Sequence, residues 1–250
     1  MDRNLKVMLL MVLAALSTPV LAQSEAGLLM EIGAEKKLSR QFSLSLEADL
    51  RTRNNFKTMD RWSVGLNAEY KPVKFLRLNA GYTMLNSNFR EDISYNASGS
   101  YNNWTPSYWG IRHRFNASVT GTYKFYNNLR ISLRERWQYT YRPEKTVTRW
   151  DFDNSWWEDK VRKGKGKNQL RSRLQLEYDR KGALLTPFVN VELYNSWAIE
   201  KVRYTIGTDF SLSKQHRFSL FYRFQNMHNV DADEYDPNMH YVGVGYKFKF

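Results

Sequence analysis

Apolar and polar residues alternate with a period of two along much of this chain. In residues 42–51 every even position is apolar and every odd position is polar or charged. Residues 129–141 alternate in the same way, with the odd positions apolar except for Glu135. Residues 170–178 and 217–225 alternate less strictly. Because successive side chains of a β-strand point to opposite faces, this period predicts strands that separate an apolar from a polar environment.

Weaker segments of the same kind bring the total to about eleven, each near the roughly 9–11 residues that a tilted strand needs to cross a bilayer. After Gln23 no apolar run approaches the length of a transmembrane helix. The weaker segments start near Leu28, Trp62, Leu76, Phe115, Val189, Val202 and Val242.

The connections between these segments alternate in length. Short turns are expected at residues 36–39, 71–74, 126–128, 180–183 and 213–216, and between them lie mostly longer loops, of which residues 87–110 and 142–168 are the longest. Short periplasmic turns and long outer loops are typical of outer-membrane proteins. We therefore predict an all-β fold, a single antiparallel transmembrane β-barrel of 10 to 12 strands.

The strand count raises a difficulty. Single-chain bacterial barrels have an even number of strands, so ten or twelve strands are expected rather than eleven. Either one strand is overlooked, or the first segment, at residues 28–35, lies in the lumen.

The N-terminus has the pattern of a secretory signal peptide. Arg3 and Lys6 precede an apolar stretch at residues 7–16, and small residues end it at Ala22. We predict a signal peptide at residues 1–22 and an outer-membrane barrel at residues 23–250. Removing the first segment would leave a net charge of +12.

The composition agrees with a barrel wall that has one apolar face and one polar face. Aromatic residues make up 15% of the chain, yet the mean hydropathy is −0.64. The alternative is a soluble sandwich or lipocalin-like barrel, which also alternates but carries its polar face outside. The chain has no cysteine, so it does not rely on disulfides, and its net charge of +13 is spread along alternating segments rather than gathered as in a nucleic-acid patch.

The end of the chain is its most specific local signal. Apolar residues alternate with glycine and lysine through residues 242–250, and the last residue is aromatic. Tyr246, Phe248 and Phe250 resemble the C-terminal signal by which the barrel assembly machinery reads its clients. We expect that machinery, outer-membrane lipids and lipopolysaccharide as partners.

Several short motifs resemble a family of bacterial outer-membrane proteins catalogued as domain of unknown function 2490. The resemblance implies a β-barrel in the outer membrane of a Gram-negative bacterium, and it implies no activity. The residues that carry it are 35–39 leading into 42–44, Arg51, 70–72 before 76–78, Gly81 with Tyr82, and 242–246.

The polar face is rich in arginine. If it faces inward, opposite charges could pair across a narrow lumen and fill it, or the excess of cations could leave an anion-selective path. Five of these arginines, on neighbouring strands, are predicted to form one basic track: Arg130, Arg134, Arg136, Arg171 and Arg173.

No convincing catalytic constellation is found, and we expect a non-enzymatic protein without a cofactor or a metal centre. A lipid-modifying barrel enzyme would need a serine beside a histidine, but His113 and Ser118 fall on opposite faces of one strand. Asp231, Asp233 and Asp236 form a weak candidate for a loop cation site, since oxygen ligands at alternate positions can hold calcium.

The sequence leaves three functions open. The first is a structural or narrow, anion-favouring transport barrel, and the second is a lipid-modifying enzyme. The third is a surface interaction protein that uses the tryptophan-rich loops at residues 87–110 and 142–168. The basic residues at 160–167 could meet lipopolysaccharide phosphates, or they could simply be solvated.

Overall fold

The structure, a computed structural model, describes residues 24–126, 128–180, 182–228 and 236–250. These residues form fifteen strands and no helix, so the predicted all-β class is confirmed. Among them no helix is long and apolar enough to cross a membrane. The predicted signal peptide lies outside the described residues.

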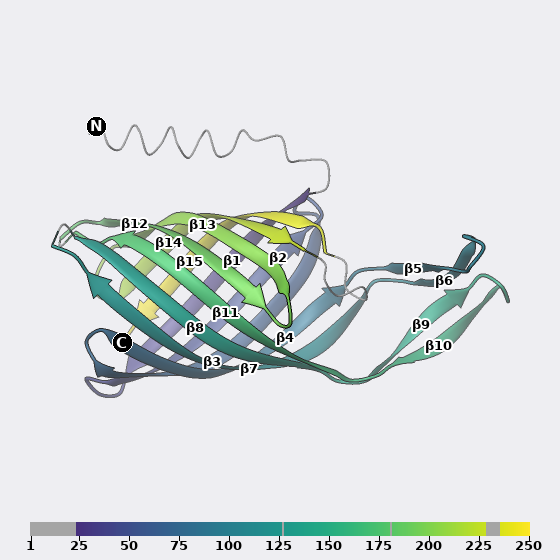
Figure 1. Cartoon of the computed structure of the whole chain (residues 1–250), viewed down its shortest axis with the longest axis horizontal. Helices are drawn as coiled ribbons and strands as arrows, with labels where there is room; N and C mark the ends of the chain where they lie inside the picture. Colours follow the sequence, from purple (N-terminus) through teal and green to yellow (C-terminus); the bar gives the residue numbers. More distant parts are fainter. Residues whose placement is uncertain (1–23, 127, 181, 229–235) are drawn as a thin grey trace.

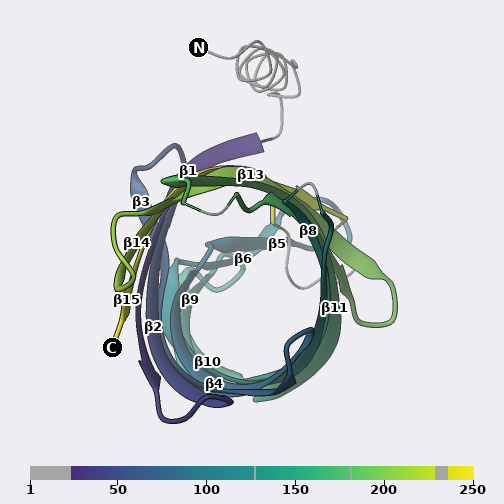
Figure 2. The same cartoon turned by 90° about the vertical axis from the view of Figure 1, so that its left-hand side faces the viewer.

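Eleven strands close into a barrel, and Figure 2 shows it end-on as a ring. They follow one another around the wall in the order β1-β15-β14-β13-β12-β11-β8-β7-β4-β3-β2. Their bounds are β1 (Ser24–Lys37), β2 (Phe42–Arg53), β3 (Thr58–Val73), β4 (Leu76–Phe89), β7 (Tyr108–Lys124), β8 (Leu129–Arg142), β11 (Lys165–Tyr178), β12 (Leu185–Asn195), β13 (Ile199–Ser211), β14 (His216–Met227) and β15 (Asn238–Lys249).

The barrel closes through one parallel pair. β1 lies between β2, to which it is antiparallel, and β15, to which it is parallel from Ser24↔Asn238 to Glu35↔Lys249. The count of eleven falls within the predicted range, but the expectations of an even number and of a purely antiparallel barrel are wrong. The first segment lies in the wall and not in the lumen. A parallel pair of strands also satisfies the backbone N–H and C=O groups with a ladder of hydrogen bonds. The barrel can therefore close with an odd number of strands.

The apolar face of the wall points outward. Leu133 and Leu220 are about half exposed, whereas Ser63, Ser132 and Thr205 are buried inside the barrel. A soluble barrel would show the opposite arrangement, so the alternative of a soluble sandwich or lipocalin-like fold is excluded. The exterior is that of a transmembrane β-barrel.

One apolar cluster interrupts the polar interior. Leu29, Phe221, Met239 and Tyr241 pack together on the inner face where β1, β14 and β15 meet. Gly243 lies between Leu29 and Phe221 in the register, and a Cβ atom there would stand 2.1 Å from Phe221 Cε2. The glycine therefore makes room for the Phe221 ring inside the wall.

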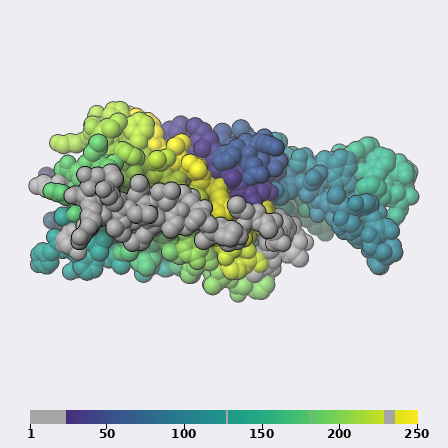
Figure 3. All heavy atoms as spheres, turned by 90° about the horizontal axis from the view of Figure 1, so that it is seen from above, coloured from purple at the N-terminus to yellow at the C-terminus, as the bar shows by residue number. Residues whose placement is uncertain are grey.

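Four short strands form a second sheet that projects beyond one end of the barrel (Figures 1 and 3). They are β5 (Asp92–Tyr95), β6 (Tyr101–Thr105), β9 (Lys145–Asp151) and β10 (Trp156–Arg162). The long connections predicted at residues 87–110 and 142–168 are present, and each contains a hairpin that the sequence analysis did not predict. Trp104, Trp150 and Trp157 are register partners across the sheet, with ring centroids of Trp157 at 5.7 and 5.4 Å from the other two.

The two ends of the barrel differ as predicted. The end opposite the projecting sheet carries five connections of two to six residues, at residues 38–41, 74–75, 125–128, 179–184 and 212–215, and the C-terminus (Figure 1). The longest connections lie at the other end, beside two short ones at residues 54–57 and 196–198. The other end carries the projecting sheet and the first residues of β1. Below, these are called the turn end and the sheet end.

The parallel seam can be tested by cross-linking, because the chain has no cysteine of its own. We expect Leu28→Cys and Val242→Cys to form a disulfide, since these residues are register partners in β1 and β15. Neighbouring strands lie about 4.7–4.9 Å apart, within the range of Cα separations that a disulfide bridges. The measurement is the mobility of the denatured chain on a non-reducing gel.

The matched control pairs Leu28→Cys with Phe248→Cys, six residues further along β15, and should not cross-link. A barrel with the first segment loose in the lumen would give no preference between the two pairs, which would refute the parallel closure.

Candidate anion site in the barrel lumen

A buried carboxylate lies at mid-height of the lumen. Glu192 on β12 accepts hydrogen bonds from Arg171 Nη2 at 3.0 Å to each oxygen, and from Arg134 on β8. The Tyr194 hydroxyl donates a further bond to Glu192 Oε2 at 3.0 Å. The Glu192 side chain is 7% exposed, and ion pairs this deep are strong only when both partners keep such hydrogen bonds.

Three cationic side chains lie close to the ring of Tyr194. The guanidinium carbons of Arg171 and Arg203 lie 4.4 and 4.6 Å from its centroid, and Lys201 Nζ lies 4.6 Å away. Cations over an aromatic face are attracted by its electron density. Glu192 and Tyr194 together therefore hold the cations that converge from β8, β11 and β13.

The predicted basic track is brought together on two neighbouring strands. Arg134 lies opposite Arg173, and Arg136 opposite Arg171, in the register of β8 and β11. Like charges directly opposite each other destabilise a sheet, so the carboxylate of Glu192 compensates this repulsion. Arg130 lies nearer the turn end, where it pairs with Glu177.

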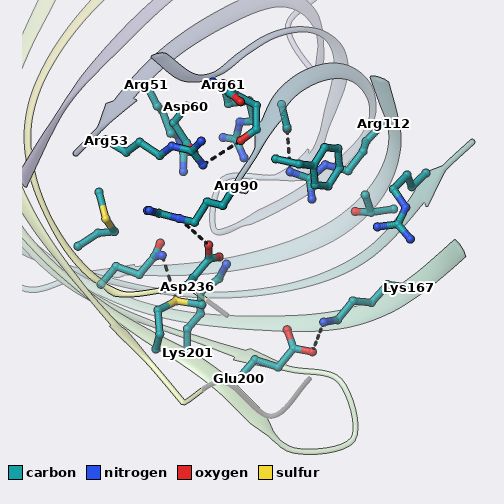
Figure 4. Close-up of a pocket in the computed structure, with 18 of the residues that line it drawn as sticks. Arg51, Arg53, Asp60, Arg61, Arg90, Arg112, Lys167, Glu200, Lys201 and Asp236 are labelled. Carbon is teal, nitrogen blue, oxygen red and sulfur yellow. Dashed lines mark hydrogen bonds and ion pairs between the residues drawn. The ribbon is translucent and has the colours of Figure 1, made fainter. Parts of the chain in front are cut away.

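The cavity lies closer to the sheet end than this track. It has a volume of about 380 Å³, and Figure 4 shows side chains from many strands converging on it. None of the five track arginines is among its lining residues. Twelve of the lining side chains are basic and five are acidic. The basic ones are Arg51, Arg53, Arg61, Arg90, Arg112, Arg114, Arg142, Arg162, Lys165, Lys167, Lys201 and Arg203.

Acidic side chains neutralise part of this charge at the rim. Arg90 donates to both oxygens of Glu25, at 2.8 and 2.9 Å, and its Nε lies 3.9 Å from Asp236 (Figure 4). Lys167 pairs with Glu200 at 2.7 Å. Burial lowers the pKa of Arg90, but the hydrogen bond and charge of Glu25 outweigh it and hold that pKa above its ordinary value. These pairs order the rim of the cavity.

Deeper in the cavity, cations exceed carboxylates. Asp49 is shared by Arg61, at 3.3 Å, and Arg51, at 3.8 Å. The buried Nε atoms of Arg51, Arg61 and Arg112 have no hydrogen-bond partner among the described residues. Guanidinium groups present several donors in a fixed fork that suits carboxylate and phosphate oxygens. The arrangement can hold an anion.

The other residues singled out in the sequence lie elsewhere. His113, His216 and His240 each hydrogen-bond a tyrosine hydroxyl on the outer face, at 2.8, 2.9 and 2.6 Å, and not a serine. Ser118 is buried on the inner face, opposite to His113. The described residues contain no cluster of three or more side chains able to hold a metal ion.

Two further predictions can be placed only in part. Asp231 and Asp233 lie outside the described residues, and Asp236 is the rim partner of Arg90. Tyr246 and Phe248 lie on the outer face near the turn end, where Tyr246 contacts Phe218 and Phe248 contacts Phe250.

Sequence reasoning missed the position of the cavity. Arg53, Arg90 and Arg112, which line it, lie near strand ends at the sheet end, outside the segments whose alternation predicts inward-facing positions. Arg112 lies two residues before Arg114 on β7, so the alternation of side chains along a strand would place both on the inner face. No comparable signal exists for Arg90, which follows the end of β4.

A family model described as "Protein of unknown function (DUF2490)" matches residues 26–236. The chain belongs to this family. The match covers β1 through β14 and ends at the rim residue Asp236, so the projecting sheet and all cavity-lining residues except Met239 and Tyr241 lie within the family region.

Two other comparisons complete this result. The search of functionally curated proteins gives no match. Among solved structures, the chain is similar to the crystal structure of the beta domain of the Bordetella autotransporter Brka, with 12% identity and a TM-score of 0.48 over 84% of this chain and 82% of that chain.

The central carboxylate gives a stability prediction. We expect Glu192→Gln to lower the midpoint of thermal unfolding strongly, because Arg134 and Arg171 would stay buried without their counter-charge. Breaking a buried ion pair by removing one partner costs roughly 3–5 kcal/mol. The measurement is the loss of heat-modifiable gel mobility as the temperature rises.

Glu177→Gln is the matched control, since it removes a lumen carboxylate whose partner Arg130 is 34% exposed. The Glu177 side chain is 16% exposed against 7% for Glu192, so this pair is less buried and the midpoint should move less than for Glu192→Gln. Equal shifts for the two variants would contradict a special role of Glu192.

Proposed function

We propose that this protein is an outer-membrane β-barrel whose lumen admits small anions from the sheet end and passes them in a narrow, anion-favouring manner. The observation that supports this most directly is the excess of basic over acidic side chains around the 380 Å³ cavity. Rings of Arg and Lys attract anions and raise their local concentration.

The outer membrane is proposed as the location because of the wall itself. Its exterior is apolar at mid-height and its strands have the length and alternation of membrane-crossing strands. We propose further that the sheet end faces the outside and the turn end the periplasm. The aromatic residues Tyr246 and Phe248 of β15, together with Phe250 after it, then serve as the signal for the assembly machinery.

The same geometry favours conduction that is narrow rather than wide. The lining of the cavity ends near Arg51, Arg203 and Tyr241, and the network around Glu192 and Tyr194 lies beyond it. An anion that leaves the cavity toward the turn end therefore meets arginines already bound to a carboxylate. We propose that these side chains exchange partners as the anion moves, and that no covalent chemistry takes place.

The test is single-channel conductance of the refolded protein in planar bilayers under a salt gradient. We expect small, anion-selective steps whose selectivity falls at high salt, because the Debye length shrinks from about 10 Å at 0.1 M to about 3 Å at 1 M. Changing Arg51 and Arg61 to Glu should shift the reversal potential toward cations, since both line the cavity.

Lys214→Glu in the turn before β14 is the control for each single variant, Arg51→Glu and Arg61→Glu, because it makes the same charge change as either one outside the cavity. Folding of each variant is confirmed by heat-modifiable gel mobility. A folded protein that leaves the bilayer silent would reject the anion path.

A second candidate function, contact with lipopolysaccharide, is favoured by the projecting sheet. Its strands are ordered and packed, and Trp156 and Trp157 are more than half exposed. Lys160 and Lys163, both exposed, lie where β10 returns to the barrel rim. We propose that these lysines bind lipopolysaccharide phosphates, with the tryptophans beside the attached sugars.

This candidate predicts that added lipopolysaccharide raises the unfolding temperature of the detergent-purified protein more than zwitterionic lipid does. Changing Lys160 and Lys163 to Glu should remove most of the difference, because phosphate contacts depend on charge. Lys214→Glu again serves as the control. An equal stabilisation of wild type and double variant would exclude these lysines as the phosphate site.

A further inference from the structure

The outer face of the barrel carries one acidic side chain at mid-height. Glu135 is the seventh residue of the fourteen-residue strand β8, and its neighbours on the same face, Leu133 and Trp137, are about half exposed. Among the described barrel strands it is the only Asp, Glu, Lys or Arg at an outward-facing position away from the strand ends. It therefore lies where the wall meets lipid.

Among the described residues a single side chain hydrogen-bonds it. The Ser172 hydroxyl on β11 donates to Glu135 Oε2 at 2.6 Å, and the two residues are register partners. Ser172 is itself an outward-facing polar residue in an otherwise apolar row, between Leu170 and Leu174. The two exceptions to the alternation of β8 and β11 thus lie side by side.

One serine does not satisfy a carboxyl group in hydrocarbon. A carboxyl group has two oxygens and can take part in several hydrogen bonds, whereas lipid tails offer none. Ionisable groups within a membrane usually face a partner, a bundle interior or a cavity. The outer wall here provides Glu135 with no second polar side chain at hydrogen-bond distance in the described residues.

We propose that Glu135 and Ser172 form the polar centre of an interface with a second copy of this chain. In a two-fold dimer whose axis is parallel to the barrel axis, equal heights face each other and each residue meets its own register partner. Glu135 of one copy then meets Ser172 of the other, and the reverse. The Ser172 O–H already donates to the carboxyl group of its own chain, but the hydroxyl oxygen keeps lone pairs that can accept a hydrogen bond from the carboxyl O–H of the other copy's Glu135. The pair is therefore self-complementary under this symmetry.

The surrounding face suits such a contact. Leu133, Trp137, Leu170 and Leu174 surround the polar pair and are all about half exposed. Large apolar side chains, tryptophan above all, supply most of the energy at interface centres, while hydrogen bonds between membrane-embedded polar groups fix the partner. The inference rests on the membrane setting of the barrel but not on anion passage.

The test is the monomer–dimer equilibrium of the full barrel in lipid nanodiscs or mild detergent, measured by mass photometry at several protein concentrations. We expect a concentration-dependent dimer for the wild type. Glu135→Leu should weaken dimerisation by about tenfold or more, since both symmetry-related hydrogen-bond sets are lost. Ser172→Leu should act in the same direction.

The same variants separate this role from a structural one. Because leucine suits lipid better than a carboxyl group, Glu135→Leu should leave the unfolding temperature of the monomer unchanged or raised. Val191→Leu, an outward-facing change on β12, is the control and should leave the dimer intact.

A wild type that stays monomeric at high protein-to-lipid ratio would overturn the proposal. So would a dimer that Glu135→Leu does not weaken. Failure of the barrel to insert into lipid, seen as lost heat-modifiable mobility, would instead reject the membrane setting on which the proposed function also rests.

Discussion

Backbone hydrogen bonding is the constraint on which the rest of this structure depends. In hydrocarbon no water is present to bond a free N–H or C=O group, so a sheet that crosses a membrane must close on itself. The parallel pairing of β1 with β15 achieves this with eleven strands. Once the wall is closed, the pleat alone decides which side chains face lipid and which face the lumen.

The lumen then becomes an electrostatic problem. Strand parity places arginines directly opposite one another on β8 and β11, so that the interior needs counter-charges at mid-height. The Glu192 carboxylate supplies one, and the ring of Tyr194 lies against Arg171, Arg203 and Lys201. Toward the sheet end the cavity remains, and its twelve basic lining side chains outnumber the five acidic ones. The excess of positive charge lies below a rim that carboxylates partly neutralise.

The sequence predicts the wall better than its closure. Residues 42–51 and 129–141 alternate strictly enough to define β2 and β8, because the two faces of each strand meet different solvents. The same pattern says nothing about the direction of a neighbour, which is why the parallel seam was not foreseen. The hairpins of the projecting sheet were not predicted either. In strands as short as Asp92–Tyr95, with water on both sides, apolar and polar residues need not alternate.

The departures from alternation carry information of their own. Leu29 and Phe221 are apolar side chains on the polar side, and each is satisfied within the chain because they pack with Met239 and Tyr241. Glu135 is a polar side chain on the apolar side, and the hydrogen bond from Ser172 satisfies only part of its hydrogen-bonding capacity. An inward exception can be compensated by the opposite wall of the lumen. An outward exception faces lipid, so its compensation has to come from another molecule, and a second copy of this barrel offers a hydrogen-bonding hydroxyl group at the same height.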